Sequence, residues 1–343
     1  MKRVPPRTAA LVAIVAGVVV AVGAEVCSAV RSSREAVLAA PSVASTPLDA
    51  VLTGPHILFR STLPGAGYGL VAAVSLTDPG GSRAFTTVAC DRVTRAGDST
   101  VCLRTVRGVA TTYEAERLDA QWTAVQTWPL SGIPSSTRSS PDGSLVATTA
   151  YVADHCSTQI APPTETRIRG TDGTDLGNLE TWTLLVDGAP FTAVDRNFWD
   201  VSFVDEDTFY VTVGAQSAGT TWIATGTVST RTIETVRAGG ESPSVSPDGS
   251  KVAYTTTTDE GGQSVQVYAV LDVESGTRTL YPATAGGDDQ VEWLDDTTIL
   301  YGMPRTDEPG TTDVWALDLS TDGAQPRVLI PGASAPTVVR PTS

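Results

Sequence analysis

The chain has 343 residues, of which 41% are hydrophobic and 18% are charged. This composition is sufficient for a packed core and excludes wholesale disorder. The formal net charge of −15 argues against nucleic acid as a partner, because an acidic surface repels the phosphate backbone. With only two histidines in the chain, a His-rich metal cage is excluded as well.

The N-terminal residues have the layout of an export signal. Lys2, Arg3 and Arg7 precede an uncharged apolar run over 9–24. As a helix this run spans about 24 Å, which is less than the roughly 30 Å of a hydrocarbon core. Residues 1–30 are therefore predicted to be a signal peptide or an uncleaved N-terminal membrane anchor, and both remain open. In either case the acidic body is extracytoplasmic, secreted or tethered to the membrane, because the basic flank stays on the cytoplasmic side.

Residues 31–53 are predicted to be a flexible linker. Serines and prolines are mixed there with alanines, and the hydrophobic residues follow no regular period. Such a segment holds a folded domain at a modest distance from the membrane.

The cysteines agree with an exported protein. Cys90 and Cys102 lie equally far from Ala96, at the centre of a predicted hairpin turn, where they could face each other across two strands. In an oxidising compartment they form either a disulfide or two separately buried thiols. Cys156 has no obvious partner, and no paired short spacing of cysteines indicates a zinc site.

From residue 54 onward, short β-prone runs alternate with Gly, Pro, Asp and Ser turns at roughly ten-residue spacing, which is typical of a sandwich, barrel or propeller. The segment Ser-Pro-Asp-Gly-Ser occurs at 140–144 and again at 246–250, each time before a predicted strand. Turn aspartates recur after 63, 43 and 47 residues, at Asp142, Asp205, Asp248 and Asp295. A unit of four strands in roughly 45 residues has the dimensions of a propeller blade.

Six such units fit into residues 54–340, followed by a short tail over 341–343. The predicted fold is therefore all-β, a six-bladed β-propeller preceded by an N-terminal hydrophobic helix. The first unit, 54–86, lacks its innermost strand, and the chain end at 335–340 resembles the innermost strand of the fifth unit. We expect this C-terminal strand to complete the first blade and close the ring, which leaves no open end to aggregate.

Two segments complicate the repeat. Residues 113–122 have a helix-forming composition, but the repeat register assigns them to the outer strands of the second blade, and we follow the repeat. The long 63-residue spacing predicts an enlarged loop in the third blade, placed around 155–169.

The repeated Ser-Pro-Asp-Gly-Ser followed by a strand resembles the signature of TolB-type six-bladed propellers. The resemblance to exported bacterial TolB-like proteins extends over Cys90–Leu103, Ile133–Ala147, Asn197–Phe203, Glu241–Ala253 and Asp288–Leu300. It implies a propeller fold, export, and a role as a binding platform. The best-known relative, a periplasmic partner of an envelope complex, has an additional N-terminal α/β domain, for which residues 31–53 are too short.

The two repeated turns are interpreted as structural. Proline presets such a turn, aspartate accepts backbone N–H groups, and glycine adopts the left-handed conformation. The residues concerned are Pro141, Asp142, Gly143, Pro247, Asp248 and Gly249.

Polar residues before and along two predicted innermost strands are candidates for a binding site. In a propeller such segments reach the central channel, where they could form an acidic, oxygen-rich funnel for Ca²⁺ or for a cationic group of a ligand. The alternative is ordinary solvated loop charge. The candidates are Asp195, Asn197, Asp200, Asp288, Asp289 and Gln290.

No arrangement of residues indicates a catalytic site, since the chain has no nucleophile elbow and only two histidine bases. We therefore expect a non-enzymatic, extracytoplasmic binding or scaffolding propeller, monomeric, that recruits a protein or peptide at the cell envelope and needs no cofactor. The alternative is a calcium-dependent propeller hydrolase or a ligand sensor that uses the acidic funnel.

Overall fold

The structure, a computed structural model, describes residues 44–152, 163–284 and 290–340. The predicted export segment, Cys156 and the tail over 341–343 lie outside these ranges. Within them, no helix combines the length and the apolar character needed to cross a membrane.

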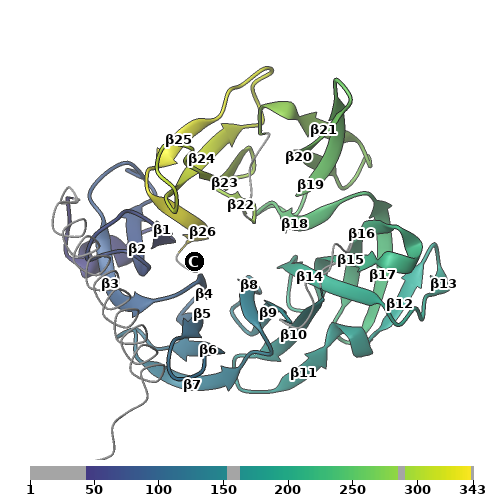
Figure 1. Cartoon of the computed structure of the whole chain (residues 1–343), viewed down its shortest axis with the longest axis horizontal. Helices are drawn as coiled ribbons and strands as arrows, with labels where there is room; N and C mark the ends of the chain where they lie inside the picture. The colour runs from purple at the N-terminus through teal and green to yellow at the C-terminus, as the bar shows by residue number, and fades with distance from the viewer. Residues whose placement is uncertain (1–43, 153–162, 285–289, 341–343) are drawn as a thin grey trace, which may run out of the picture.

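Six β-sheets surround a central axis, one sheet for each predicted blade (Figure 1). Blade 1 contains β1 (His56–Ser61), β2 (Leu70–Ser75), β3 (Ala84–Ala89) and β26 (Ala333–Val339). Blade 2 contains β4 (Arg92–Ala96), β5 (Ser99–Val106), β6 (Thr112–Leu118) and β7 (Ala124–Pro129). Blade 3 contains β8 (Ile133–Ser139), β9 (Leu145–Tyr151), β10 (Thr164–Gly170) and β11 (Asp175–Asn178).

The other half of the ring has the same plan. Blade 4 contains β14 (Arg196–Phe203), β15 (Thr208–Ala215), β16 (Thr220–Thr227) and β17 (Thr232–Ala238). Blade 5 contains β18 (Glu241–Val245), β19 (Lys251–Glu260), β20 (Gln263–Asp272) and β21 (Arg278–Tyr281). Blade 6 contains β22 (Glu292–Trp293), β23 (Thr298–Pro304), β24 (Thr312–Asp318) and β25 (Arg327–Ile330). Short 3₁₀ turns are η1 (Leu179–Thr181), η2 (Gln216–Ala218) and η3 (Pro282–Thr284).

The C-terminal strand closes the ring, as the sequence predicts. β26 is the innermost strand of blade 1 and pairs antiparallel with β1, from His56 opposite Val339 to Ser61 opposite Ala333. The first blade is thus built from both ends of the described chain, and no sheet is left incomplete at the closure.

The segment with helical composition is β, as the repeat register requires. β6 pairs with both neighbours in blade 2, and the chain turns at Trp122 before β7. Leu118 and Trp122 are buried in the core between blades 1 and 2. Tertiary burial therefore overrides the local helix propensity of these residues.

Part of the segment predicted to be an enlarged loop is a strand instead. Residues 164–169 belong to β10, a regular strand of blade 3, while 153–162 lie outside the described residues. Other residues in the 63-residue interval between Asp142 and Asp205 form two additional strands, β12 (Thr183–Val186) and β13 (Ala189–Pro190). These strands extend the outer edge of blade 4. β12 pairs parallel with β17, so blade 4 has six strands and projects outward (Figure 1).

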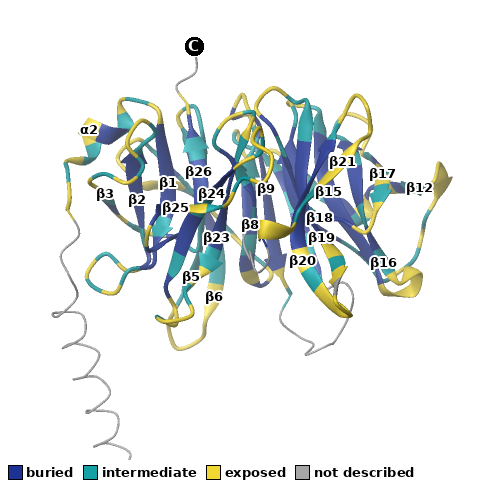
Figure 2. Ribbon diagram, turned by 90° about the horizontal axis from the view of Figure 1, so that it is seen from above, coloured by how far each residue is buried: buried dark blue, intermediate teal, exposed yellow. Residues whose placement is uncertain are grey.

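The core lies within and between the blades, where one face of each sheet contacts the next. Figure 2 shows the buried residues along the strands and the exposed residues in the turns at both rims. Between blades 5 and 6, the rings of Tyr268 and Tyr301 lie 5.0 Å apart and pack beside Trp293. Each interface between blades therefore needs side chains from two repeats, which couples neighbouring blades.

Residues 44–53, expected to be part of a flexible linker, are instead docked on blade 1. Ser45 forms a parallel β-bridge with Arg83, and α2 (Leu48–Leu52) follows it. Val51 is buried in the cluster that also contains Trp122 and Cys90. The apolar face of this helical turn covers the junction between blades 1 and 2, which explains its order.

Candidate functional site

The centre of the ring holds a cavity of about 310 Å³ to which all six blades contribute. It opens at the carboxyl ends of the innermost strands, on the face that carries the two Ser-Pro-Asp-Gly turns. Pro141, Pro247 and Arg340 at its mouth are exposed to solvent. One lining residue from each innermost strand, in the order β4, β8, β14, β18, β22, β26, is Thr94, Arg138, Ser202, Ser244, Trp293 and Thr337.

The cavity is basic. Three arginines line it, Arg95, Arg138 and Arg340, and Glu292 is the one carboxylate in the described lining, so positive charges exceed negative charges by two. A smaller space of about 10 Å³ next to it is lined by Arg92 and again by Arg138. The net charge at the centre of the ring is therefore positive, opposite in sign to that of the whole chain.

Arg138 and Glu292 form an ion pair across the cavity, between blades 3 and 6. Their side chains are only 12% and 13% exposed. Arg138 also donates to the Val291 carbonyl, and Glu292 Oε1 accepts the backbone N–H of Val338 at 2.9 Å. The pair thus connects three blades and fixes the position of the Arg138 guanidinium.

Arg95 lies at the end of β4 and is half-buried. Its Nη1 donates to Thr100 Oγ1 at 3.3 Å. Burial lowers the pKa of Arg95, and the nearby charge of Asp98 opposes this effect. Behind it, the His56 ring is buried and hydrogen-bonded to the Gly54 carbonyl, and burial together with the charge of Arg95 lowers the pKa of His56.

Each described candidate for the predicted acidic funnel has local contacts of its own. Asp195 is partly exposed and accepts the N–H and hydroxyl of Ser217 at 2.6 and 2.8 Å. Asn197 donates to the Asp195 carbonyl, and Gln290 lines the smaller space. Asp200 alone is buried, in a bulge of β14 at φ 56°.

Asp200 Oδ2 accepts the Ser242 hydroxyl at 2.6 Å. The neighbouring Glu241 has a raised pKa, mainly because of burial and also because of the negative charge of Asp200. Asp288 and Asp289 lie outside the described residues. Across the described ranges, no three His, Cys, Asp or Glu side chains are grouped so that they could hold a metal ion.

Both repeated turns have the hydrogen bonds expected of them. Asp142 Oδ1 accepts the Ser140 hydroxyl at 2.5 Å and the Ser144 N–H at 3.0 Å. Asp248 Oδ1 accepts the equivalent groups of Ser246 and Ser250 at 2.6 and 3.0 Å. These donors lower the pKa of Asp248 to about 2. The aspartates therefore shape the mouth of the cavity through the backbone.

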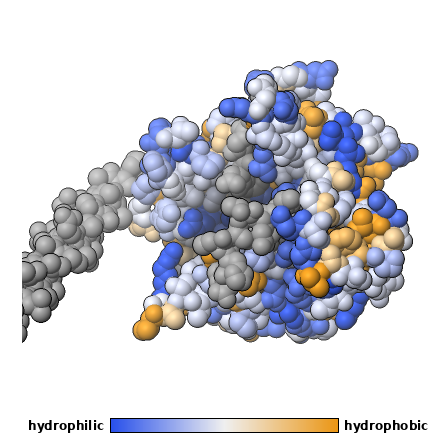
Figure 3. Space-filling model, turned by 45° about the vertical axis from the view of Figure 1, so that its right-hand side comes forward, coloured by the Kyte–Doolittle hydropathy of each residue, from blue (hydrophilic) through white to orange (hydrophobic). Residues whose placement is uncertain are grey.

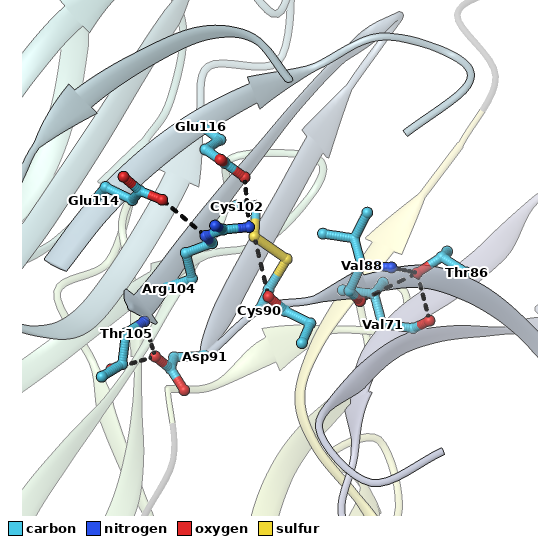
Figure 4. Close-up of a disulfide and its surroundings, with 11 residues drawn as sticks. Val71, Thr86, Val88, Cys90, Asp91, Cys102, Arg104, Thr105, Glu114 and Glu116 are labelled. Carbon is cyan, nitrogen blue, oxygen red and sulfur yellow. Dashed lines mark hydrogen bonds and ion pairs between the residues drawn. A yellow bond between two sulfur atoms is a disulfide. The ribbon is translucent and has the colours of Figure 1, made fainter. Parts of the chain in front are cut away.

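Cys90 and Cys102 form a disulfide with a Cα–Cα distance of 5.5 Å (Figure 4). The hairpin turn is shifted from the predicted position, since Ala96 pairs with Ser99 and Cys102 is opposite Val93. Cys90 instead lies in the connection between β3 and β4. The disulfide therefore attaches the crossover between blades 1 and 2 to the second strand of blade 2.

The residues that lock the ring closure are not marked by any pattern in the sequence. Arg83 is buried, and it donates to the Gly332 carbonyl at 3.1 Å and to the Pro331 carbonyl. Asp313 accepts the Gly332 N–H at 2.6 Å and pairs with Arg305. No local motif marks these contacts, because Arg83 and Gly332 are 249 residues apart. The cavity arginines could have been found by aligning the residues that precede each turn, such as Arg138 before Ser140.

No family model and no curated protein matches the sequence. Among solved structures, TolB from Acinetobacter baumannii superposes with a TM-score of 0.55 at 13% identity, over 83% of this chain and 66% of that chain. A putative TolB from Agrobacterium tumefaciens gives a TM-score of 0.45 at 12% identity, over 82% and 91% of the two chains. At this identity the likeness concerns the fold. The chain therefore has the six-bladed β-propeller fold of TolB-like structures.

Proposed function

We propose that this chain is an extracytoplasmic binding propeller that recruits a protein or peptide partner at the mouth of its central cavity. The observation that carries this proposal is the cavity itself, because all six blades line it and its mouth is exposed. Ligand sites in proteins are usually preformed concave spaces of this size or somewhat larger.

Two further observations support an extracytoplasmic role. The basic and apolar N-terminal sequence has the layout of an export signal. The buried Cys90–Cys102 disulfide suits an oxidising compartment, because cytosolic thiols are kept reduced. A role in binding also agrees with the likeness to the TolB structure. Figure 3 shows hydrophilic and hydrophobic residues interspersed on the side that comes forward.

The proposal is tested by site-specific photo-crosslinking of the full chain in intact cells. A photoreactive residue at position 247, at the mouth, is expected to give one dominant adduct with an envelope protein. The control position is Val328, on β25 at the outer edge of blade 6, which is 39% exposed. The same adducts from both positions, or none from position 247, would contradict binding at the mouth.

A further inference from the structure

The central cavity carries more positive charge than its own groups neutralise. Its described lining has three guanidinium groups and a single carboxylate, while the whole chain has a net charge of −15. Serine, threonine and valine occupy most of the other lining positions, so they add no charge of either sign. The local excess of positive charge therefore favours the binding of an anion in the cavity.

The three arginines also have N–H groups left for a ligand. A guanidinium has five N–H donors in a planar fork. Arg95 donates to Thr100 Oγ1, and Arg340, exposed at the mouth, donates to the Leu294 carbonyl. Arg138 Nε is buried, and none of the described residues accepts a hydrogen bond from it, while its two terminal nitrogens donate to Glu292 and to the Val291 carbonyl. Arg95 and Arg340 thus have unused donors, whereas the charge of Arg138 is paired with that of Glu292.

We propose that Arg95, Arg138 and Arg340 form an oxyanion site at the mouth of the cavity, which takes one compact carboxylate or phosphate group of a ligand. This inference rests on the proposed function, because it names the chemistry of the group that enters the same cavity. The planar fork of arginine matches the two oxygens of either group.

The charge outside the cavity restricts what can carry that anion. An acidic body repels a ligand with many negative charges, such as a nucleic acid, before it reaches the mouth. A single anionic group at the tip of a slender ligand is repelled much less, and it gains the full attraction of the arginines once inside. The site therefore selects one terminal oxyanion, which a peptide carboxylate or a small metabolite can supply.

The test is calorimetric titration of the full chain in detergent with three probes at constant ionic strength. They are inorganic phosphate, acetyl-glycylglycine with a free carboxylate, and the matching acetyl-glycylglycine amide. We expect phosphate, the free carboxylate or both to bind, and the amide not to bind. Binding of the carboxylate indicates a peptide-like source, and binding of phosphate alone indicates a phosphorylated ligand. If neither oxyanion binds, or if the amide binds equally well, the proposal is wrong.

Variants separate the cavity from the overall charge. The double variant Arg95→Gln, Arg340→Gln is expected to weaken oxyanion binding at least tenfold. Arg278→Gln, Arg327→Gln changes the net charge equally on exposed strands outside the cavity and should bind as the wild type does. Equal weakening in both double variants would overturn the assignment.

A single variant and a separate crosslinking measurement distinguish loss of the site from loss of the fold or of the partner. Arg340→Gln alone changes one exposed residue at the end of β26, so it should fold and show a smaller loss. Crosslinking from position 247, which leaves all three arginines in place, is scored separately. A crosslinked partner without oxyanion binding would refute this inference and leave the proposed function standing. Oxyanion binding without a crosslinked partner would support this inference and contradict the proposed function.

Discussion

The two Ser-Pro-Asp-Gly turns permit a matched test of the contact between blades 2 and 3. Gly143 and Gly249 have φ values of 74° and 72°, so alanine at either position must adopt the left-handed conformation, at a cost of about 1–2 kcal/mol. A Cβ at Gly249 would meet no atom within 4 Å, whereas at Gly143 it would lie 2.8 Å from the Ala96 carbonyl oxygen of blade 2. Relief of this clash requires a shift between blades, which costs about 1–3 kcal/mol more.

We therefore expect Gly249→Ala to lower the free energy of unfolding by about 1–2 kcal/mol and Gly143→Ala by about 2–5 kcal/mol. The measurement is urea unfolding followed by far-UV circular dichroism, with the wild type and both variants treated identically. Equal losses in the two variants would refute the close approach of the blades at Gly143. A negligible loss in Gly249→Ala would refute the left-handed turn itself.

Removal of the disulfide by Cys90→Ala, Cys102→Ala should lower the free energy of unfolding by about 3 kcal/mol, the value expected from the length of the loop that the disulfide closes. Reducing conditions should lower the free energy of unfolding of the wild type by the same amount and leave that of the double variant unchanged. Asp248, with a pKa of about 2, stabilises the folded chain above the ordinary aspartate pKa, and this stabilisation is lost as the pH falls toward 2. A carboxyl NMR titration checks this, and an ordinary value would contradict it. Trp293→Phe removes the buried 2.9 Å hydrogen bond from Nε1 to the Ser244 carbonyl and should destabilise by about 1–3 kcal/mol in thermal unfolding; an unchanged melting temperature would show that this bond contributes little.

The hydrophobic and turn pattern of the sequence was sufficient to predict the fold. Each blade repeats a local motif, so the Ser-Pro-Asp-Gly turns, the roughly 45-residue spacing and the C-terminal strand could be found by comparing the chain with itself. The same register correctly assigned residues 113–118 to a strand against their helical composition, while 119–122 form the turn that follows it. Local periodicity is informative because most strand pairs form between neighbours in the sequence.

The candidate site was less predictable. The acidic candidates lie before or along the innermost strands, and sequence order alone placed them in one funnel. The structure shows that Asp195 caps a local turn and that the cavity opens at the opposite ends of these strands, where arginines gather.

The sequence by itself determined the repeat, the closure of the ring and the turns, because these depend on residues close together in the chain or on copies of one motif. Only the tertiary structure decided which charges meet. Arg138 and Glu292 are 154 residues apart, and Arg83 and Gly332 are 249 residues apart. Such pairs arise when the ring closes and brings blades together at the axis and at the closure, and no local pattern in the sequence records that approach.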